Sequence, residues 1–242
     1  MAARVSLFIP CFIDQLQPQV AVDVVRVLRR LGYEVDFPAE QTCCGQPAFN
    51  MGYWDEARPL AERFVRLFGS AECVVSPSGS CTTMVRTFYP QLLAGHALYD
   101  QAVGLGKRVF EFSEFLVRVA KKVDVGAEFP HKVTFHDACH ALRELHLKDE
   151  PRELLRHVRG LELVEMPHSE ECCGFGGGFA VKFDMISASM GEGKVMNIEA
   201  SGAEVVTSVD GSCLMHIEGM LRRNQARART MHLASILAQE AK

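Results

Sequence analysis

The sequence predicts an α/β protein built from two pseudo-repeated units, each a parallel sheet with cysteine-bearing loops at the C-terminal ends of its strands. Three observations support this fold class. Short β-branched segments alternate with amphipathic helices along the 242 residues, which is typical of parallel sheets with crossover helices. Cysteines recur at nearly the same spacing in both halves. Prolines and glycines stand where several of the predicted helices begin and end.

The cysteine repeat divides the chain into two predicted units, residues 1–125 and 126–242. Each unit has one cysteine, then after 31 or 32 residues a Cys-Cys-Gly triplet, and after a further 35 or 38 residues a last cysteine. Cys73 alone stands outside this pattern, inside a predicted strand, and we expect it to pack in the core. The repeated cysteines are Cys11, Cys43, Cys44, Cys81, Cys139, Cys172, Cys173 and Cys213.

The first half predicts strands and helices in alternation. Pro18 suits the first turn of a helix that Gly32 ends, and Gly69 ends a second helix with apolar residues on one face. In order, we expect a strand over 5–9, a helix over 18–31, a strand over 33–37, a helix over 54–68, a strand over 72–76 and a short helix over 82–89.

The second half repeats this order with a weaker first helix. We expect a strand over 132–135, a helix over 151–158, an extended segment over 161–166, a helix over 184–200, a strand over 204–209 and a short helix over 214–223. Residues 91–130 contain a strand and helix, over 109–121, that resemble 232–239; we expect them to complete the first unit and link the two. Every repeated cysteine follows a predicted strand. Because ligands in parallel sheets gather beyond those ends, we expect two lobes whose cysteine loops face each other.

Composition excludes several classes of protein. The net charge is -4, with acidic and basic residues mixed along the chain, so we expect no nucleic-acid binding. No apolar stretch approaches the ~20 residues that span a bilayer, and the N-terminal segment has no cleavage site, so we expect no membrane span and a cytoplasmic location. Cytoplasmic cysteines stay reduced, which favours metal ligands over disulfides.

Four cysteines per half match the ligands of a cubane iron-sulfur cluster or of a tetrahedral zinc ion. The glycine-rich run at 174–178 allows two interpretations: backbone amides approaching a cluster or phosphate, or a close-packed turn with positive backbone angles. His136, His140 and His168 lie near cysteines; each is a candidate ligand, hydrogen-bond donor or proton acceptor, and for each we expect a structural or surface role instead. Without a paired nucleophile and base or a dinucleotide fingerprint, we expect no catalysis by this chain alone.

The segments around the cysteines resemble the cysteine-rich CCG-domain family, which includes the cysteine-rich component of heterodisulfide reductase. The absence of a ferredoxin-type Cys-x2-Cys-x2-Cys-x3-Cys run makes the chain similar to the lactate utilization A branch of that family. The matching segments are Phe8-Ile9-Pro10-Cys11, Thr42-Cys43-Cys44-Gly45-Gln46-Pro47, Ser78-Gly79-Ser80-Cys81 and Cys172-Cys173-Gly174-Phe175-Gly176-Gly177.

The resemblance implies an iron-sulfur electron-transfer component of a complex that oxidises L-lactate to pyruvate, for use of lactate as a carbon source. Its partners are then the other subunits of that complex, and the eight repeated cysteines hold one or two clusters of the [4Fe-4S] kind, or zinc in one half. The family's complete pattern has a fifth cysteine where this chain has Ser78 and Asp210, which implies a simpler cluster. Two alternatives stay open: a heterodisulfide or thiol reductase component, and a zinc-stabilised four-cysteine scaffold.

Overall fold

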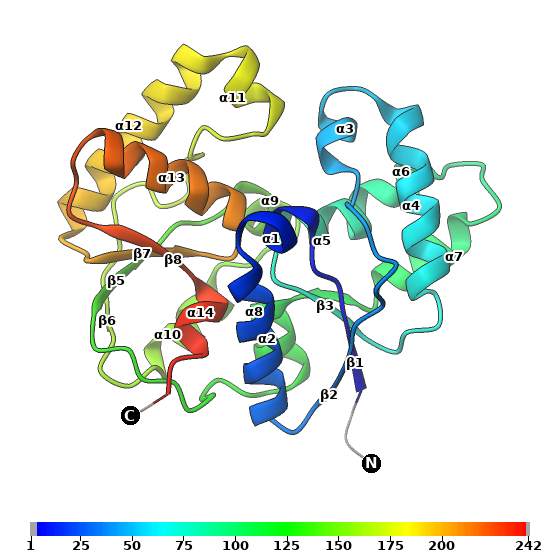
Figure 1. Ribbon diagram of the computed structural model, residues 1–242, viewed down its shortest axis with the longest axis horizontal. Helices are drawn as coiled ribbons and strands as arrows, with labels where there is room; N and C mark the ends of the chain where they lie inside the picture. Colours follow the sequence, from blue (N-terminus) through cyan, green and yellow to red (C-terminus); the bar gives the residue numbers. More distant parts are fainter. Residues whose placement is uncertain (1–3, 241–242) are drawn as a thin grey trace.

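The computed structural model describes residues 4–240 and confirms the predicted α/β fold class. Its strands form two four-stranded sheets, ordered β2-β1-β3-β4 and β6-β5-β7-β8, and every pairing within them is parallel. The two orders are equivalent, because each sheet adds its four strands in the same sequence along the chain. The sheets lie side by side and their helices surround them (Figure 1).

The first sheet is assembled from short strands joined by helical crossovers. Its central pair, β1 and β3, aligns Ser6 with Val74 and Leu7 with Val75. The elements of this half are β1 (Arg4–Leu7), α1 (Cys11–Leu16), α2 (Pro18–Arg30), β2 (Glu34–Asp36), α3 (Gln46–Asn50), α4 (Trp54–Phe68), β3 (Val74–Ser76), α5 (Gly79–Thr83), the π-helix η1 (Met84–Phe88), α6 (Tyr89–Leu92), α7 (Tyr99–Gly106), β4 (Val109–Glu111), α8 (Phe112–Glu114) and the π-helix η2 (Phe115–Val119).

The second sheet repeats that plan, with β5 and β7 as its central pair. Val133 aligns with Val205 and Phe135 with Thr207. The elements of this half are β5 (Lys132–Phe135), α9 (Cys139–Arg143), α10 (Asp149–Arg156), β6 (Glu162–Leu163), α11 (Gly178–Lys182), α12 (Asp184–Ser201), β7 (Val205–Ser208), α13 (Gly211–Arg223), β8 (Arg229–His232) and α14 (Leu233–Leu237).

The two longest helices lie where the sequence predicts them. Helix α4 has the predicted bounds, and α12 ends one residue after them. The helix predicted over 82–89 instead begins at Gly79 and runs through η1 into α6. Cys73 is half-buried against the core but lies one residue before β3 rather than inside it.

One hydrophobic core joins the two halves. Helix α2 packs on α14, and residues of both sheets, such as Leu7 and Phe135, belong to the same buried cluster. Arg30 of α2 strengthens this junction, because its guanidinium donates hydrogen bonds to the carbonyls of Leu237 and Ala238 at 3.1 and 3.0 Å. The boundary at residues 125 and 126 therefore stays a prediction about repeats, since the core is continuous across it.

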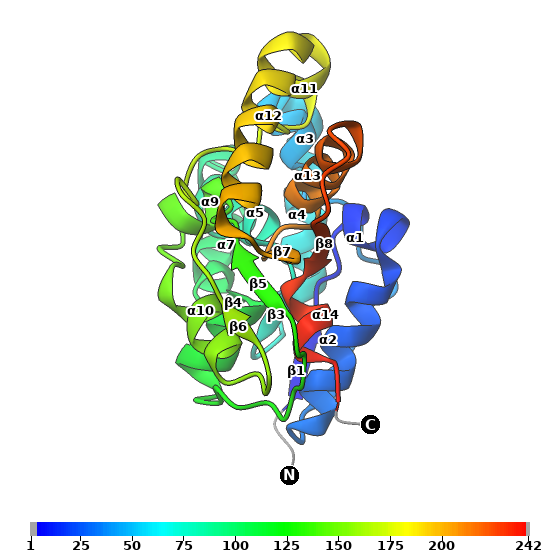
Figure 2. The ribbon, with the colours of Figure 1, turned by 90° about the vertical axis from the view of Figure 1, so that its left-hand side faces the viewer.

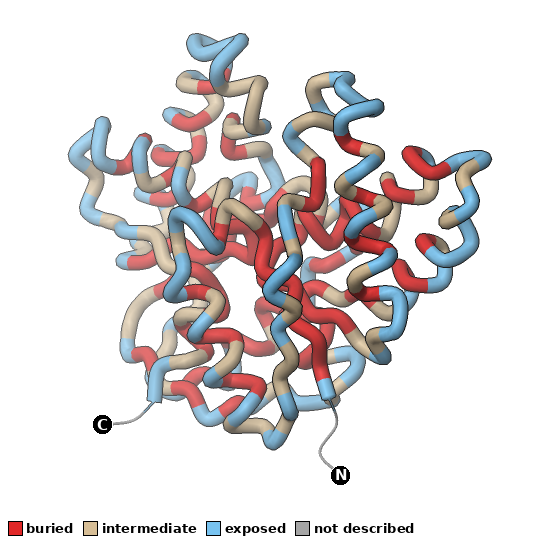
Figure 3. Tube along the Cα trace, turned by 45° about the vertical axis from the view of Figure 1, so that its right-hand side comes forward, coloured by how far each residue is buried: buried red, intermediate tan, exposed pale blue. Residues whose placement is uncertain are grey.

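The central strands of both sheets are mostly buried, whereas the edge strands β2 and β6 are not, and exposure is greatest on the outer helices and loops (Figure 3). The hairpin of α11 and α12 projects from the body beside the second sheet, as the side view makes clear (Figure 2). It exposes several apolar side chains, among them Val181 and Met185, each 82% exposed. Among residues 4–240, no helix has the length and apolar character needed to cross a membrane.

Candidate metal centre

All eight repeated cysteines line one cavity of about 360 Å³ between the two halves. Its lining residues include the first residues of α1, α9 and α13 and the second and third of α5. These helices begin beyond the C-terminal ends of the central strands, close to one another (Figure 1). Chain direction explains this convergence, because parallel strands deliver the residues that follow them to the same edge of a sheet. The structure therefore brings together the cysteines that the sequence pattern singles out.

Local sequence fixes where each cysteine stands. Cys11 and Cys139 are the first residues of α1 and α9, shortly after the central strands β1 and β5. Cys81 and Cys213 are the third residues of α5 and α13, which follow the other central strands, β3 and β7. Each half therefore presents one cysteine from each of its two central strands.

The glycine of each Cys-Cys-Gly triplet is required by its backbone conformation. Gly45 has φ +85° and Gly174 has φ +95°, a left-handed region that side chains disfavour. In this conformation each glycine N–H donates to the sulfur of the first cysteine of its triplet, Cys43 or Cys172, at 3.4 Å. A Cβ on Gly174 would also lie 2.5 Å from the carbonyl oxygen of Ser187, so only glycine fits.

In the first site the four sulfurs form a chain of contacts. The Sγ atoms of Cys44 and Cys81 lie 3.3 Å apart, and the Tyr89 hydroxyl donates to the Cys44 carbonyl at 2.9 Å. Hydrogen bonds from Cys11 and then Cys44 lower the pKa of Cys43 to about 3. The same bonds, together with burial, raise the pKa values of Cys11 and Cys44. Cys43 is thus the thiolate of this site at neutral pH.

The second site repeats this arrangement and adds a histidine. Hydrogen bonds from Cys139 and then Cys173 lower the pKa of Cys172 to about 2, while those two thiols have raised pKa values. A ring nitrogen of His136 and the sulfurs of Cys173 and Cys213 all lie within 4.8 Å of one another. Burial, and after it the charge of Lys194, lowers the pKa of His136 to about 4, so its ring is neutral.

Ser78 and Asp210 stand at the positions of the missing fifth cysteines, and the side chain of each accepts hydrogen bonds from within the protein. The Ser78 hydroxyl accepts from the N–H of Cys81 at 3.3 Å and thereby caps α5. The Asp210 carboxylate accepts from the N–H and hydroxyl of Ser80 in the other half, at 2.7 and 3.1 Å. Asp210 therefore ties the second half to the first, and burial raises its pKa.

The same two loops exchange contacts between the halves. A Cβ built on Gly79 would lie 2.6 Å from the Cβ of Ala141 in α9, and one built on Gly211 would lie 2.8 Å from Cδ1 of Ile13 in α1. Each Gly-Ser-Cys loop thus packs against the helix that begins with the other half's first cysteine. Glycine is needed in both loops because the halves approach so closely.

The remaining sequence candidates differ in position. His140 lines the cavity, while the side chain of His168 is 62% exposed and its Nδ1 lies 3.5 Å from the Glu171 carboxylate. In the glycine-rich run, Gly176 and Gly177 have positive φ angles, as a tight turn requires. These two glycines also line the cavity.

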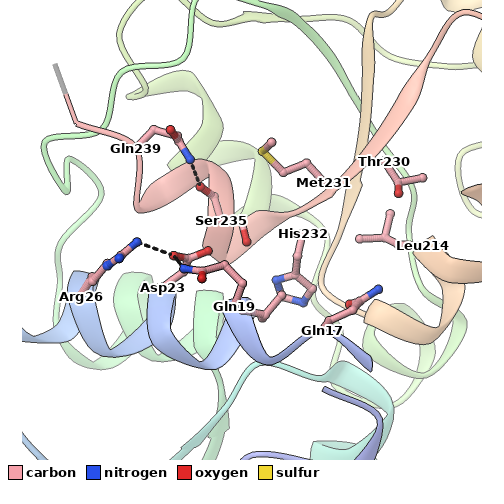
Figure 4. Close-up of a pocket in the computed structure, with 11 residues that line it drawn as sticks. Gln17, Gln19, Asp23, Arg26, Leu214, Thr230, Met231, His232, Ser235 and Gln239 are labelled. Atoms are coloured by element: carbon pink, nitrogen blue, oxygen red, sulfur yellow. Dashed lines mark hydrogen bonds and ion pairs between the residues drawn. The ribbon is translucent and has the colours of Figure 1, made fainter. Parts of the chain in front are cut away.

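A second hollow, of about 540 Å³, lies between α2 and the segment formed by β8 and α14 (Figure 4). Its lining is mostly polar: Asp23 accepts hydrogen bonds from Gln19 at 2.8 Å and Arg26 at 3.2 Å. His232 also faces this hollow. None of the repeated cysteines lines it, so the thiol chemistry is confined to the smaller cavity.

The donor set of the cysteine cavity fits a soft metal. Thiolate sulfur is the preferred ligand of iron-sulfur clusters and is common at zinc sites. Each half offers four sulfurs, one of them already ionised, and both ring nitrogens of the buried His136 have no hydrogen-bond partner among the described residues. The four sulfurs of each half suit a soft metal, and in the second half His136, which is not among the lining residues, adds a ring nitrogen within 4.8 Å of two of those sulfurs.

Fold and site together define a duplicated α/β protein with a four-cysteine site at the edge of each parallel sheet. The model of the CCG cysteine-rich domain matches residues 5–86 and again residues 133–218. Lactate utilization protein A 1 of Bacillus mycoides (strain KBAB4) is 46% identical over 240 residues, covering 99% of this chain and 98% of the relative. Lactate utilization protein A 2 of Bacillus cereus (strain 03BB102) is 43% identical over 236 residues, covering 97% and 98%. The chain therefore belongs to the CCG cysteine-rich domain family.

Among solved structures, a putative Asp/Glu racemase from Yersinia pestis aligns with 98% of this chain and 96% of its own, with 10% identity and a TM-score of 0.35. A likeness this weak carries no argument about the site.

Proposed function

We propose that this chain is the iron-sulfur electron-transfer component of a complex that oxidises L-lactate to pyruvate. The observation that carries the proposal is that two four-cysteine sites, one from each half, open into a single cavity. Metals held on the two sides of one cavity of about 360 Å³ would be close neighbours, which favours electron transfer between them over a purely structural role. The substrate rests on the full-length similarity to lactate utilization proteins A.

The residues that would hold the metal are the cysteines of each half. When bound, an iron-sulfur cluster supplies one-electron redox chemistry, with a potential set by its ligands and surroundings. The chain itself supplies ionised sulfur at Cys43 and Cys172, and the glycine N–H groups of each triplet stabilise that charge. Apolar neighbours such as Phe12, Ile13 and Phe175 keep much of the cavity wall dry.

The partners would be other subunits of the same complex, which bind lactate and exchange electrons with this chain. The exposed apolar side chains of the α11 and α12 hairpin support this part of the proposal. The hairpin begins at Gly178, which itself lines the cysteine cavity. A partner protein covering Val181 and Met185 would thus lie beside the proposed clusters.

The deciding experiment measures iron, acid-labile sulfide and zinc in full-length protein purified without oxygen. We expect about four iron and four sulfide per occupied half, with a paramagnetic signal that appears or disappears on dithionite reduction. The Cys172→Ser variant should lose the contribution of the second site, while Cys73→Ser, outside the repeat, should retain both. Mixing the loaded chain with its partner subunits should then restore electron flow from lactate.

Two outcomes would contradict the proposal. Stoichiometric zinc without iron in both halves would support the alternative of a zinc-stabilised scaffold. If the loaded cluster reacts with disulfides but accepts no electrons from the lactate-oxidising partners, the alternative of a thiol reductase component would be supported.

A further inference from the structure

The two cysteine sites differ at one buried position. Three residues before the first cysteine of each half stands Phe8 in the first and His136 in the second. Both side chains are 0% exposed, and both follow the central strand of their sheet. The repeat thus places an imidazole where its counterpart has a hydrocarbon ring.

No hydrogen bond of good geometry satisfies that imidazole among residues 4–240, and the backbone of Ser169, which raises its pKa, is the weakest of the influences on the ring. Neither Nδ1 nor Nε2 of His136 has a hydrogen-bond partner, although the ring is fully buried. Burying a polar group without a partner costs free energy, so such a group needs an explanation. A neutral imidazole has one N–H and one lone pair, and the lone pair is a good metal ligand.

The ring is aimed at the second site. One of its nitrogens lies within 4.8 Å of the sulfurs of Cys173 and Cys213. Strand β7 holds its backbone, since the His136 N–H donates to the Thr207 carbonyl at 2.8 Å and the His136 carbonyl accepts from the Ser208 hydroxyl at 2.8 Å.

The next residue is also fixed. The Asp137 carboxylate accepts two hydrogen bonds from the Arg152 guanidinium, at 2.8 and 2.9 Å, and one from the Ser169 hydroxyl at 2.8 Å. Lys194 donates to the His168 carbonyl at 2.8 Å and secures the segment that leads to Cys172. In the first half the position of Asp137 is taken by Ile9, in an apolar core.

We propose that His136 is a nitrogen ligand of the metal bound in the second half, so that the two halves hold chemically different sites. The inference rests on the proposed metal sites and deepens them: the first is all-sulfur, and the second combines sulfur with nitrogen. Imidazole suits zinc as well as iron, and histidine in place of cysteine raises the potential of an iron-sulfur centre. The halves therefore differ in metal preference, or in potential when both hold iron.

The test uses cadmium as a soft probe metal on the full-length, reduced, metal-free protein. Cys11→Ser and Cys43→Ser disable the first site, so that only the second is observed. In this background, His136→Leu is compared with Phe8→Leu, which removes a buried ring at the matching position of the first half. Chelator competition gives the cadmium affinity, and cadmium NMR with heavy-nitrogen-labelled histidine reports a direct metal–nitrogen bond.

We expect His136→Leu to weaken cadmium binding at least about tenfold and to abolish the metal–nitrogen coupling, while Phe8→Leu changes neither. Unfolding of the metal-free protein separates ligation from packing: because the native imidazole is unsatisfied, His136→Leu should cost no more stability than Phe8→Leu. If His136→Leu does not fold, His136→Phe, which copies the first half, replaces it.

Unchanged affinity with no nitrogen coupling would overturn the role of His136 and leave the cysteine site standing. No cadmium binding even with His136 present would overturn the metal site of this half, and the inference with it.

Discussion

The sulfur atoms of the two sites differ in their readiness to ionise. Cys43 and Cys172 each receive hydrogen bonds from neighbouring thiols and from a glycine N–H, which stabilise the thiolate. Cys73 has no such donors among residues 4–240, and burial raises its pKa to about 11. All three are half-buried, so the contrast arises from hydrogen bonding rather than from access.

Alkylation of the metal-free protein should follow this order. At about pH 5 an ordinary thiol is almost fully protonated, whereas Cys43 and Cys172, with pKa values of about 3 and 2, carry the reactive thiolate. We expect iodoacetamide to modify these two first and Cys73 last, as measured by peptide mass spectrometry over time. Preferential labelling of Cys73 would contradict the assignment of the thiolates.

Asp210 is the residue on which the contact between the Gly-Ser-Cys loops depends. Its carboxylate accepts the N–H of Ser80 across the junction, and Asp210→Ala leaves that partly buried donor without its side-chain partner. We expect a loss of about 1–3 kcal/mol in the free energy of unfolding, measured in urea. Ser212→Ala is the control, because its hydroxyl bond to Asp210 lies within one loop and its loss should cost less. If both variants lose the same free energy of unfolding, the hydrogen bond between the halves adds no stability.

At single positions the sequence predicts the cysteines well but not their surroundings. Their spacing is written in the chain, and the parallel-strand rule places them together. The role of His136 is less accessible, because its burial and its orphaned ring nitrogens depend on how β5 and β7 pack. The one available signal is the mismatch between Phe8 and His136 when the halves are aligned, and the sequence alone favours a structural or surface role for this histidine.

Two helices at equivalent places in the repeat begin with different caps. The Glu111 carboxyl group caps α8, and the His232 ring caps α14 by accepting from the Ala234 N–H at 3.1 Å. Burial raises the pKa of Glu111 to about 8 and lowers that of His232 to about 4. The fold therefore favours the neutral form of both groups. Ionisation of Glu111 destabilises the folded protein at high pH, and protonation of His232 destabilises it at low pH.

His232 should reduce stability in acid. Its folded pKa lies below the ordinary value of 6.5, so its contribution is present above pH 6.5 and is lost as the pH falls toward 4. His232→Asn keeps a capping oxygen but cannot protonate. Its free energy of unfolding should therefore fall by roughly 2–3 kcal/mol less than that of the native protein as the pH is lowered. Urea unfolding at several pH values measures this slope. Equal slopes for the native protein and His232→Asn would contradict the argument.

Element by element, the sequence predicts amphipathic helices better than helices that begin inside a motif. Helix α4 is accessible because its apolar residues recur on one face and Gly69 follows it. The start of α5 at Gly79 escapes the prediction, although Ser78 is a common capping residue and caps this helix. The π-helix η1 has no periodic signature in the sequence.

The whole molecule has one main core that both halves share. Helix α2 and helix α14 lie in it together, as do Leu7 and Phe135. We therefore expect the metal-free protein to unfold in a single transition, with tryptophan fluorescence and circular dichroism giving the same midpoint. Trp54 reports on the first half alone, so a fluorescence midpoint separate from that of circular dichroism would mean that the halves unfold independently.

The reciprocal contacts of Gly79 and Gly211 also bear on the origin of the chain. Each loop packs on the opposite half in the same way, which is the rule for the self-complementary interface of a twofold symmetric dimer. A gene encoding one unit would have produced two identical chains joined through these glycines, with identical metal sites. Within one chain that carries both copies the two need not be identical, so phenylalanine can stand at this position on one side and histidine on the other.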